Sequence, residues 1–215
     1  MTLSIRVPVL ALVFAGSSAL NAQLVTAPTP NMTSSINQSC TSQFTGGPLD
    51  LGGGVTFTSS VSTSVACFNA GYGLDLNGEW DGHAGQFFGL NRGVGFMRFT
   101  FANPVAAVGG FLNWAAGDQS NGPVFIAALD ASNNVIDSFS IADILTPGQT
   151  DAGAFRGISH STADIHAFEL DNGFVVAQNL RFAPSAVVTP EPASLTLVTT
   201  GLVGMVGVVR RKRKA

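Results

Sequence analysis

The sequence predicts an all-β protein whose main domain is a β-sandwich or jelly-roll-like fold, residues 23–185, between two terminal targeting segments. Apolar and polar residues alternate with a period of two along most of this domain. Glycine, asparagine, aspartate and proline recur between the alternating segments, as expected for short strands joined by turns. No long window has helical spacing with caps, and only residues 141–145 form a weak helix candidate.

Residues 1–22 are expected to form an N-terminal signal helix. Arg6 supplies a positive charge, residues 7–15 are mostly apolar, and small residues precede possible cleavage sites after Ala19 and Ala22. The apolar segment is short for a transmembrane helix. A retained N-terminal anchor is the alternative, but the pattern favours a signal peptide that is removed.

The clearest early strands are residues 55–59 and 96–101, which alternate strictly. In the second of them Met97, Phe99 and Phe101 share one face. Asn103-Pro104 is expected to break this strand, because proline removes a backbone donor. A longer apolar strand, 105–114, then follows, and its Gly109-Gly110 pair predicts a bulge or a close approach of another backbone.

The later strands are predicted at 124–129, 135–141, 154–158, 165–170 and 174–182. The loop 130–134 should join the first two as a hairpin, and Asp171-Asn172-Gly173 should join the last two as another. Phenylalanine dominates the aromatic residues, with sixteen against one tyrosine, and it is expected to fill the core. The predicted core set is Phe87, Phe88, Phe96, Phe99, Phe101, Phe111, Phe125, Phe139, Phe168 and Phe182.

Two cysteines, Cys40 and Cys67, are the only ones in the chain, and both lie in the part expected to be exported. In an oxidising compartment they should form a disulfide. Two buried free thiols are the alternative.

The charge is distributed unevenly. Residues 23–185 carry four arginines, no lysine and twelve carboxylates, which gives this domain a net charge of −8. Such a surface excludes nucleic acid as a partner. It suits an exported protein that contacts glycans or other proteins.

The candidates for chemistry are weak, and we expect no enzyme activity. Glu79, Asp81 and His83 lie within five residues and resemble a metal or acid–base set, but their glycine-rich surroundings favour a solvated turn. Ser159-His160-Ser161 with Asp164 lacks the glycine-flanked elbow of a nucleophilic serine. His166 is expected on a partly exposed strand face.

Cofactors are not expected, although calcium is a possible ligand of two loops. Residues 118–122 and the group Asp130, Asn133 and Asn134 offer oxygen ligands, but turn chemistry explains both loops without a metal. Trp80, with Tyr72, would form a sugar-stacking platform if exposed. Trp114 lies in an apolar strand and is expected in the core.

The last 30 residues, 186–215, have three parts in order: Pro190-Glu191-Pro192, an uncharged apolar span at 193–209, and a basic tail of Arg210, Arg211, Lys212, Arg213 and Lys214. The span is 17 residues long, or about 25 Å as a helix, marginally enough for a bilayer. The basic tail predicts a cytoplasmic stop, which leaves the preceding domain outside.

This tail resembles the sorting signal of the PEP-CTERM family. The resemblance implies a Gram-negative host, an N-terminal secretion signal, a transient inner-membrane intermediate, and an exosortase-type processing enzyme as partner. Residues 101–110 also resemble a strand-turn-strand of such ectodomains, but Gln178-Asn179-Leu180 stands where many carry an acidic stretch, so no metal site is carried over.

The function expected from the sequence is therefore an exported envelope, cell-surface or extracellular-matrix protein that acts in adhesion, scaffolding or glycan contact, with exopolysaccharide as a possible partner. A secreted polysaccharide-active hydrolase using Glu79 and Asp81 is one alternative. The other is a surface protein anchored permanently by its tail.

Overall fold

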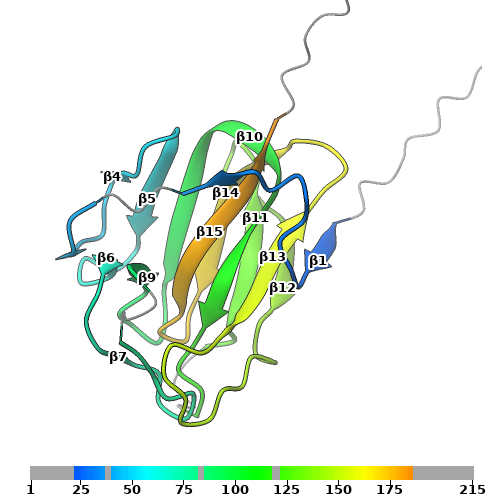
Figure 1. Ribbon diagram of the computed structural model, residues 1–215. Helices are drawn as coiled ribbons and strands as arrows, with labels where there is room; N and C mark the ends of the chain where they lie inside the picture. The colour runs from blue at the N-terminus through cyan, green and yellow to red at the C-terminus, as the bar shows by residue number, and fades with distance from the viewer. Residues whose placement is uncertain (1–21, 37–39, 82–84, 118–121, 186–215) are drawn as a thin grey trace, which may run out of the picture. The chain divides into compact units, whose positions relative to one another are not determined.

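The computed structural model describes residues 22–36, 40–81, 85–117 and 122–185, and these ranges contain only strands, turns and loops (Figure 1). The all-β prediction is confirmed: 13 strands belong to one antiparallel sheet, and β7 and β8 form a separate hairpin. The strands are β1 (Gln23–Val25), β2 (Ser34–Ser35), β3 (Gln43–Phe44), β4 (Leu49–Asp50), β5 (Val55–Ser59), β6 (Val65–Phe68), β7 (Tyr72–Gly73), β8 (Glu79–Trp80), β9 (Phe87–Gly89), β10 (Phe96–Asn113), β11 (Phe125–Leu129), β12 (Val135–Ser140), β13 (Ala154–Ser159), β14 (Ile165–Asp171) and β15 (Val176–Pro184).

The large sheet has two halves that share the 18-residue strand β10. The first part of β10, residues 96–101, lies between β5 and β14, and this first half continues through β11 to β12. The second part, from Val105 on, lies between β13 and β15, and this second half continues through β9 and β6 to β3. One long strand therefore carries the chain from one half to the other.

The predicted break at Asn103-Pro104 is wrong, because β10 runs through it. The pairing with β14 instead jumps from Thr100 to Val105, and the pairing with β15 shifts between Val105 and Ala107. A proline is tolerated here because the ladder is already interrupted by a bulge. The bulge lets β10 leave one set of neighbours and join another.

The predicted hairpin at Asp171-Asn172-Gly173 is also wrong, because β14 and β15 do not pair with each other. Asn172 and Gly173 do adopt positive φ angles of 63° and 64°, as such a turn requires. Their backbone N–H groups instead donate to the carbonyls of Gly95 and Gly93. The turn therefore passes β15 to the second half of the sheet, whereas the other predicted hairpin, β11–β12, is confirmed.

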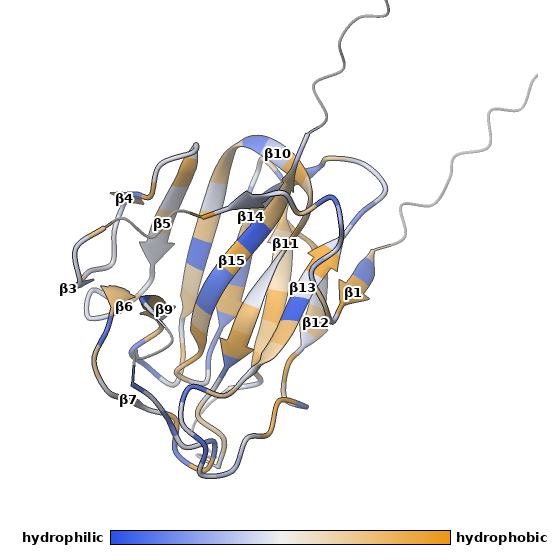
Figure 2. Cartoon of the chain, in the orientation of Figure 1, coloured by the Kyte–Doolittle hydropathy of each residue, from blue (hydrophilic) through white to orange (hydrophobic). Residues whose placement is uncertain are grey.

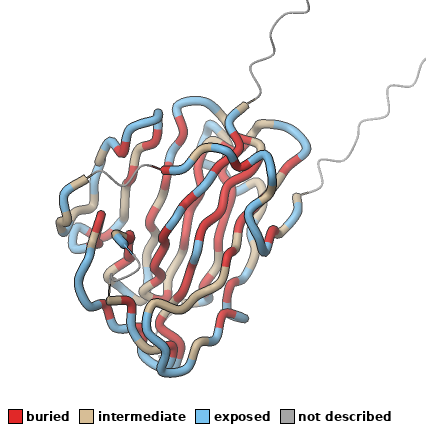
Figure 3. Tube along the Cα trace, viewed as in Figure 1, coloured by how far each residue is buried: buried red, intermediate tan, exposed pale blue. Residues whose placement is uncertain are grey.

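The core lies between the two halves. One buried apolar cluster contains Phe99 and Phe168 from the first half together with Ile158 and Leu180 from the second. Phe88 of β9 packs edge-on against Phe99, with ring centroids 5.1 Å apart. Hydropathy alternates along the strands in Figure 2, and Figure 3 shows burial concentrated on the central strands and exposure on the loops. Alternation therefore directs one face of each half inward, as predicted for Met97, Phe99 and Phe101.

The predicted core set is correct for six phenylalanines that are buried and wrong for Phe111, which is 42% exposed. Phe96, Phe125 and Phe139 are half-buried. The register of β10 shifts after Val105, which reverses the alternation of inward and outward side chains. Val108 therefore points into the core, and Phe111 points outward. The six buried rings are those of Phe87, Phe88, Phe99, Phe101, Phe168 and Phe182.

The predicted close approach at Gly109 is confirmed. A Cβ atom on Gly109 would lie 2.8 Å from the Cα of Gly157 on β13, and one on Gly157 would lie 2.4 Å from the carbonyl oxygen of Val108. Real Cβ atoms do not come this close to backbone, so β10 and β13 need glycine at both positions.

The weak helix candidate at 141–145 is not a helix. Residues 142 and 143 form a turn, closed by a hydrogen bond from the N–H of Ile144 to the carbonyl of Ile141. Both isoleucines are buried in the core, so the apolar spacing that suggested a helix serves a turn after β12.

The two ends of the described domain lie at one end of the second half. Gln23, Ser159, Ala107 and Ala183 are successive partners across β1, β13, β10 and β15. Residues 22–36 also cover the outer face of this half, where Val25 and Met32 join a small buried cluster. The N-terminal segment is therefore part of the fold.

Cys40 and Cys67 form a disulfide, as predicted, with Cα atoms 5.8 Å apart. Such a bond indicates an oxidising, extracytoplasmic location. No helix in the described ranges is long and apolar enough to cross a membrane. The predicted signal segment 1–22, apart from Ala22, and the tail, with Pro190, Glu191, Pro192 and Arg210–Lys214, lie outside the described residues.

Candidate aromatic binding pocket

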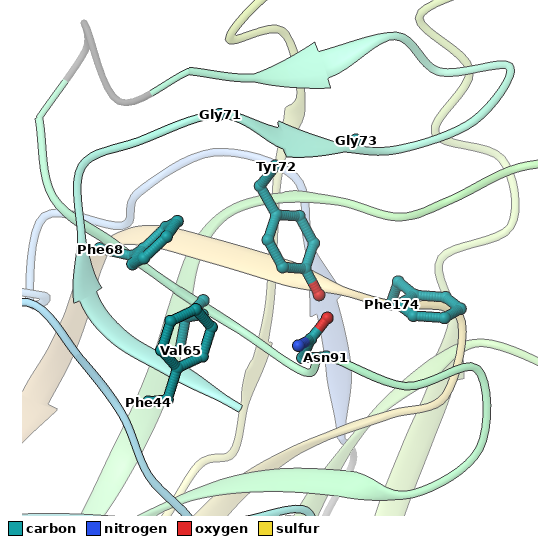
Figure 4. A pocket seen from close by; sticks show the side chains of 8 residues that line it. All are labelled: Phe44, Val65, Phe68, Gly71, Tyr72, Gly73, Asn91 and Phe174. Atoms are coloured by element: carbon teal, nitrogen blue, oxygen red, sulfur yellow. The ribbon is translucent and has the colours of Figure 1, made fainter. Parts of the chain in front are cut away.

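A pocket of about 320 Å³ lies beside the β7–β8 hairpin, at the beginning of β15 (Figure 4). This size is at the lower end of the range of small-ligand pockets. Figure 4 shows the Tyr72 ring between Phe174 on one side and Phe44 and Phe68 on the other. Among the described residues, eight line it: Phe44, Val65, Phe68, Gly71, Tyr72, Gly73, Asn91 and Phe174.

Phe44 and Phe68 form one wall from two paired strands. Phe44 on β3 is opposite Val65 on β6, and the Phe44 and Phe68 ring centroids are 5.5 Å apart. Phe44 is 61% exposed, which is unusual for an aromatic ring that has a neighbouring apolar surface available. The Cys40–Cys67 disulfide joins the two segments that carry these rings, so the covalent link holds this wall in place.

Tyr72 forms the floor. Its hydroxyl donates a hydrogen bond of 2.7 Å to the buried carbonyl of Leu90, and burial raises the pKa of the phenol. A Cβ on Gly89 would lie 3.2 Å from the Tyr72 ring, so glycine leaves room for that ring. Because the hydroxyl is bonded to the backbone, the part of Tyr72 that lines the pocket is its aromatic ring.

Phe174 forms the opposite wall, and the turn before β15 positions it. Its φ angle is 48°, and its N–H donates to the carbonyl of Arg92. A phenylalanine with positive φ is uncommon, and such strain is often found at ligand contacts. The Asn172-Gly173 turn that sends β15 to the second half thus also turns the Phe174 ring to the pocket.

The described lining of the pocket is neutral. None of the described residues that line it is ionisable, and among them Asn91 contributes the single side-chain amide. Figure 4 places this amide near the hydroxyl end of Tyr72. Aromatic faces with one amide suit an uncharged ligand that has an apolar face and polar groups at its edge.

The carboxylate group predicted around Glu79 does not enter the pocket. Glu79 is exposed, and the backbone N–H of Asp81 is held by the carboxylate of Asp151 at 2.9 Å. His83 lies outside the described residues. Trp80 is only 1% exposed and belongs to the buried cluster beneath the pocket, so the platform that required its exposure is ruled out.

His160 is buried and held between two carboxylates. Its Nδ1 lies 2.6 Å from Asp164 Oδ1, and its Nε2 lies 3.1 Å from Asp137 Oδ2. The second contact lacks hydrogen-bond geometry, so we describe it as an electrostatic contact only. Both ring nitrogens therefore face carboxylates and not Ser159 or Ser161, and His160 links β12 to the turn before β14. His166 is half-buried on β14, as expected.

A second ionic group lies on the outer face of the first half. Arg98 pairs with Glu169 at 2.5 Å and its guanidinium lies 4.8 Å from the centre of the Phe96 ring. Burial and, next, the charge of Glu169 raise the pKa of Asp171 to about 7, while Arg98 opposes the shift. Asp171 Oδ2 is a buried atom with no hydrogen-bond partner in the structure.

In the loop considered as a calcium site, the carboxylate of Asp130 is hydrogen-bonded within its own turn. Asp130 accepts bonds from the N–H groups of Ser132 and Asn134 and from the Asn134 side chain, which lowers its pKa. Asn133 accepts a bond from Arg98. The other candidate loop, apart from Gly122, lies outside the described residues. Within the described ranges no three acidic, histidine or cysteine residues are placed to hold a metal.

Of the side chains that line the pocket, sequence reasoning singled out only Tyr72 and missed Phe44, Val65, Phe68, Asn91 and Phe174. Phe44 stands in a strand of two residues, too short for alternation to predict its exposure. Phe174 was assigned to a strand, but it precedes β15.

Trp114, which was expected in the core, is half-buried against the core cluster and donates its indole N–H to the carbonyl of Ile144.

No protein-family model matches the chain, and no curated protein matches it.

Proposed function

We propose that the protein is an exported, non-enzymatic envelope or extracellular-matrix protein that contacts glycans through the aromatic pocket. The observation that carries this proposal is a neutral hollow bordered by Phe44, Phe68, Tyr72 and Phe174 with the amide of Asn91. The C–H groups on one face of a sugar ring pack on aromatic faces, and an amide bonds its hydroxyl groups. A neutral lining without an acid pair supports binding in preference to hydrolysis.

We propose in addition that the domain is a β-sandwich of the jelly-roll type. The support is the single core cluster that combines residues of both halves of the sheet, together with the bulge at which β10 changes neighbours. Strands that switch sheets through a bulge are a known means of closing such a fold.

The C-terminal tail suggests how the protein reaches its destination. Export by the N-terminal signal, retention at the inner membrane through residues 193–209, and processing near Pro190-Glu191-Pro192 by an exosortase-type enzyme would deliver it to the outer envelope, the cell surface or the matrix. The disulfide is consistent with the exported location. The intact mass of the protein recovered from the cell surface tests this route: an uncut C-terminus would show a permanently anchored protein instead.

A glycan array probed with the full chain tests the binding function. We expect binding to uncharged oligosaccharides that Phe44→Ala abolishes. Phe111→Ala is the matched control, because Phe111 is also an exposed phenylalanine and lies outside the pocket. Equal loss in both variants, or no binding by the unmodified chain, would contradict the proposal.

A further inference from the structure

A second hollow of about 180 Å³ adjoins the aromatic pocket and shares two lining residues with it. Gly73 and Phe174 border both, while Asp75 and Ala115 complete the second. The two hollows therefore meet at Gly73 and Phe174. A ligand that extends past these two residues would border both hollows.

Asp75 gives the second hollow a charge that the first lacks. The side chain is exposed, and the described residues provide no salt bridge or hydrogen bond to its carboxylate. A Cβ on Gly117 would lie 2.8 Å from Asp75 Oδ2, so a larger residue there would crowd the carboxylate. The residue itself is fixed, because Asp75 bridges to Ala116 and the N–H of Leu76 donates to the Ala116 carbonyl.

The charges of the surrounding domain act in the same direction. Residues 23–185 carry a net charge of −8, and two of their four arginines are paired, Arg98 with Glu169 and Arg156 with Asp143. Arg92 is the cation nearest in sequence to the pocket, but it lines neither hollow. An anionic polymer would be repelled here, and a cationic one attracted.

We propose that the two hollows are subsites of one groove that binds an amino-sugar oligomer, with a free ammonium group at Asp75 and a sugar ring against Phe44 and Tyr72. This inference rests on the proposed glycan contact and adds its substrate class. The aromatic subsite supplies affinity for any sugar with an apolar face, whereas the Asp75 subsite distinguishes an ammonium group from its neutral N-acetylated counterpart.

Calorimetric titration of the full chain with a glucosamine hexamer and with the N-acetylglucosamine hexamer tests the proposal. At low ionic strength we expect the glucosamine hexamer to bind about three- to fivefold more tightly, in line with one exposed ion pair. Asp75→Asn should make the two affinities equal, and added salt should reduce the difference. Glu79→Gln, which removes an exposed carboxylate of the same hairpin outside both hollows, should leave the preference unchanged.

The outcomes separate the two levels of the proposal. If both hexamers bind equally and Phe44→Ala removes both, glycan contact stands and the amino-sugar preference is overturned. The amino-sugar proposal is also overturned if the preference persists in Asp75→Asn. It is overturned as well if a uronic-acid oligomer binds more tightly than the glucosamine hexamer and Arg92→Gln removes that binding. If neither hexamer nor a neutral glucose hexamer binds more tightly to the unmodified chain than to Phe44→Ala, both levels fail.

Discussion

Two groups of aromatic rings in this protein have the same composition and different surroundings. The central group, Phe57, Phe88 and Phe99, is fully buried, with ring centroids 5.1 to 5.6 Å apart. The edge group continues from buried Phe87 through Phe68 to exposed Phe44 at similar spacings. Ring spacing therefore does not distinguish packing from a binding surface. What distinguishes them is the exposure of the last ring, which is 61% for Phe44 and 0% for Phe99.

The strongest test of the central group is Phe99→Ala. Phe99 contacts Phe57 and Phe88 between the two halves of the sheet, so its removal leaves a cavity that rigid strands cannot fill. We expect a loss of about 3–5 kcal/mol in the free energy of unfolding, measured by urea denaturation. A loss below about 1 kcal/mol would mean that the halves are not packed on each other.

The disulfide gives the second largest effect and acts on the edge group. Replacing both Cys40 and Cys67 by serine should lower the free energy of unfolding by about 2–4 kcal/mol, because the unfolded chain regains the entropy of the closed loop. Glycan affinity should fall as well, since the Phe44–Phe68 wall loses its covalent link. Binding that is unchanged in a folded double variant would show that strand pairing alone holds this wall.

Asp171 provides a test that depends on pH. Its pKa is raised to about 7 in the folded protein, above the ordinary value of 3.8, so the folded state binds the extra proton between these pH values. The contribution of Asp171 to the free energy of unfolding should therefore be largest below pH 4, and it should be lost as the pH rises through 7. The full shift corresponds to about 4 kcal/mol, and solvent screening of this half-buried group reduces the expected change to about 1–2 kcal/mol.

Asp171→Asn removes this titration, and thermal melts between pH 5 and pH 8 should then show a flatter profile than the unmodified chain. Asp50→Asn, which removes an exposed carboxylate, should keep the original profile. Identical slopes in all three proteins would indicate that Asp171 remains solvated and ionised.

The smallest stability effect is expected for Phe44→Ala. Because most of this ring is exposed, its removal should change the free energy of unfolding by less than about 0.5 kcal/mol. Its effect on glycan binding should be large, which is the reverse of the expectation for Phe99. Urea denaturation and calorimetric titration of the same two variants give a direct comparison, and a destabilised Phe44→Ala would remove the distinction.

The sequence predicted the central group better than the edge group for a physical reason. Strict alternation in residues 96–101 placed Phe99 in the predicted core set, whereas Phe57, on the alternating strand 55–59, was left out of that set although it is buried. The edge group stands on strands of two to four residues, where the period of two cannot be read. Its geometry depends on a disulfide and on the positive φ of Phe174, which are tertiary features.

The wrong prediction of a strand break and the wrong prediction of a hairpin have a common origin. Asn103-Pro104 and Asn172-Gly173 are both strong local signals, and both occur where the chain passes between the halves of the sheet. Local sequence specified the turn conformation correctly in the second case, as the positive φ angles show. Which strand pairs after the turn is decided by burial of β15 against β10, which no local pattern encodes.

The row of partners from Gln23 to Ala183 places both ends of the described domain at one end of the second half, while the pocket borders the other end of β15. The nine residues of β15 separate them by about 30 Å at roughly 3.3 Å per residue. The pocket therefore lies far from the residues at which the described domain continues into either terminal segment. If the proposed glycan contact holds, several copies held near one another would retain a long polysaccharide by avidity, so weak single sites would suffice for firm adhesion.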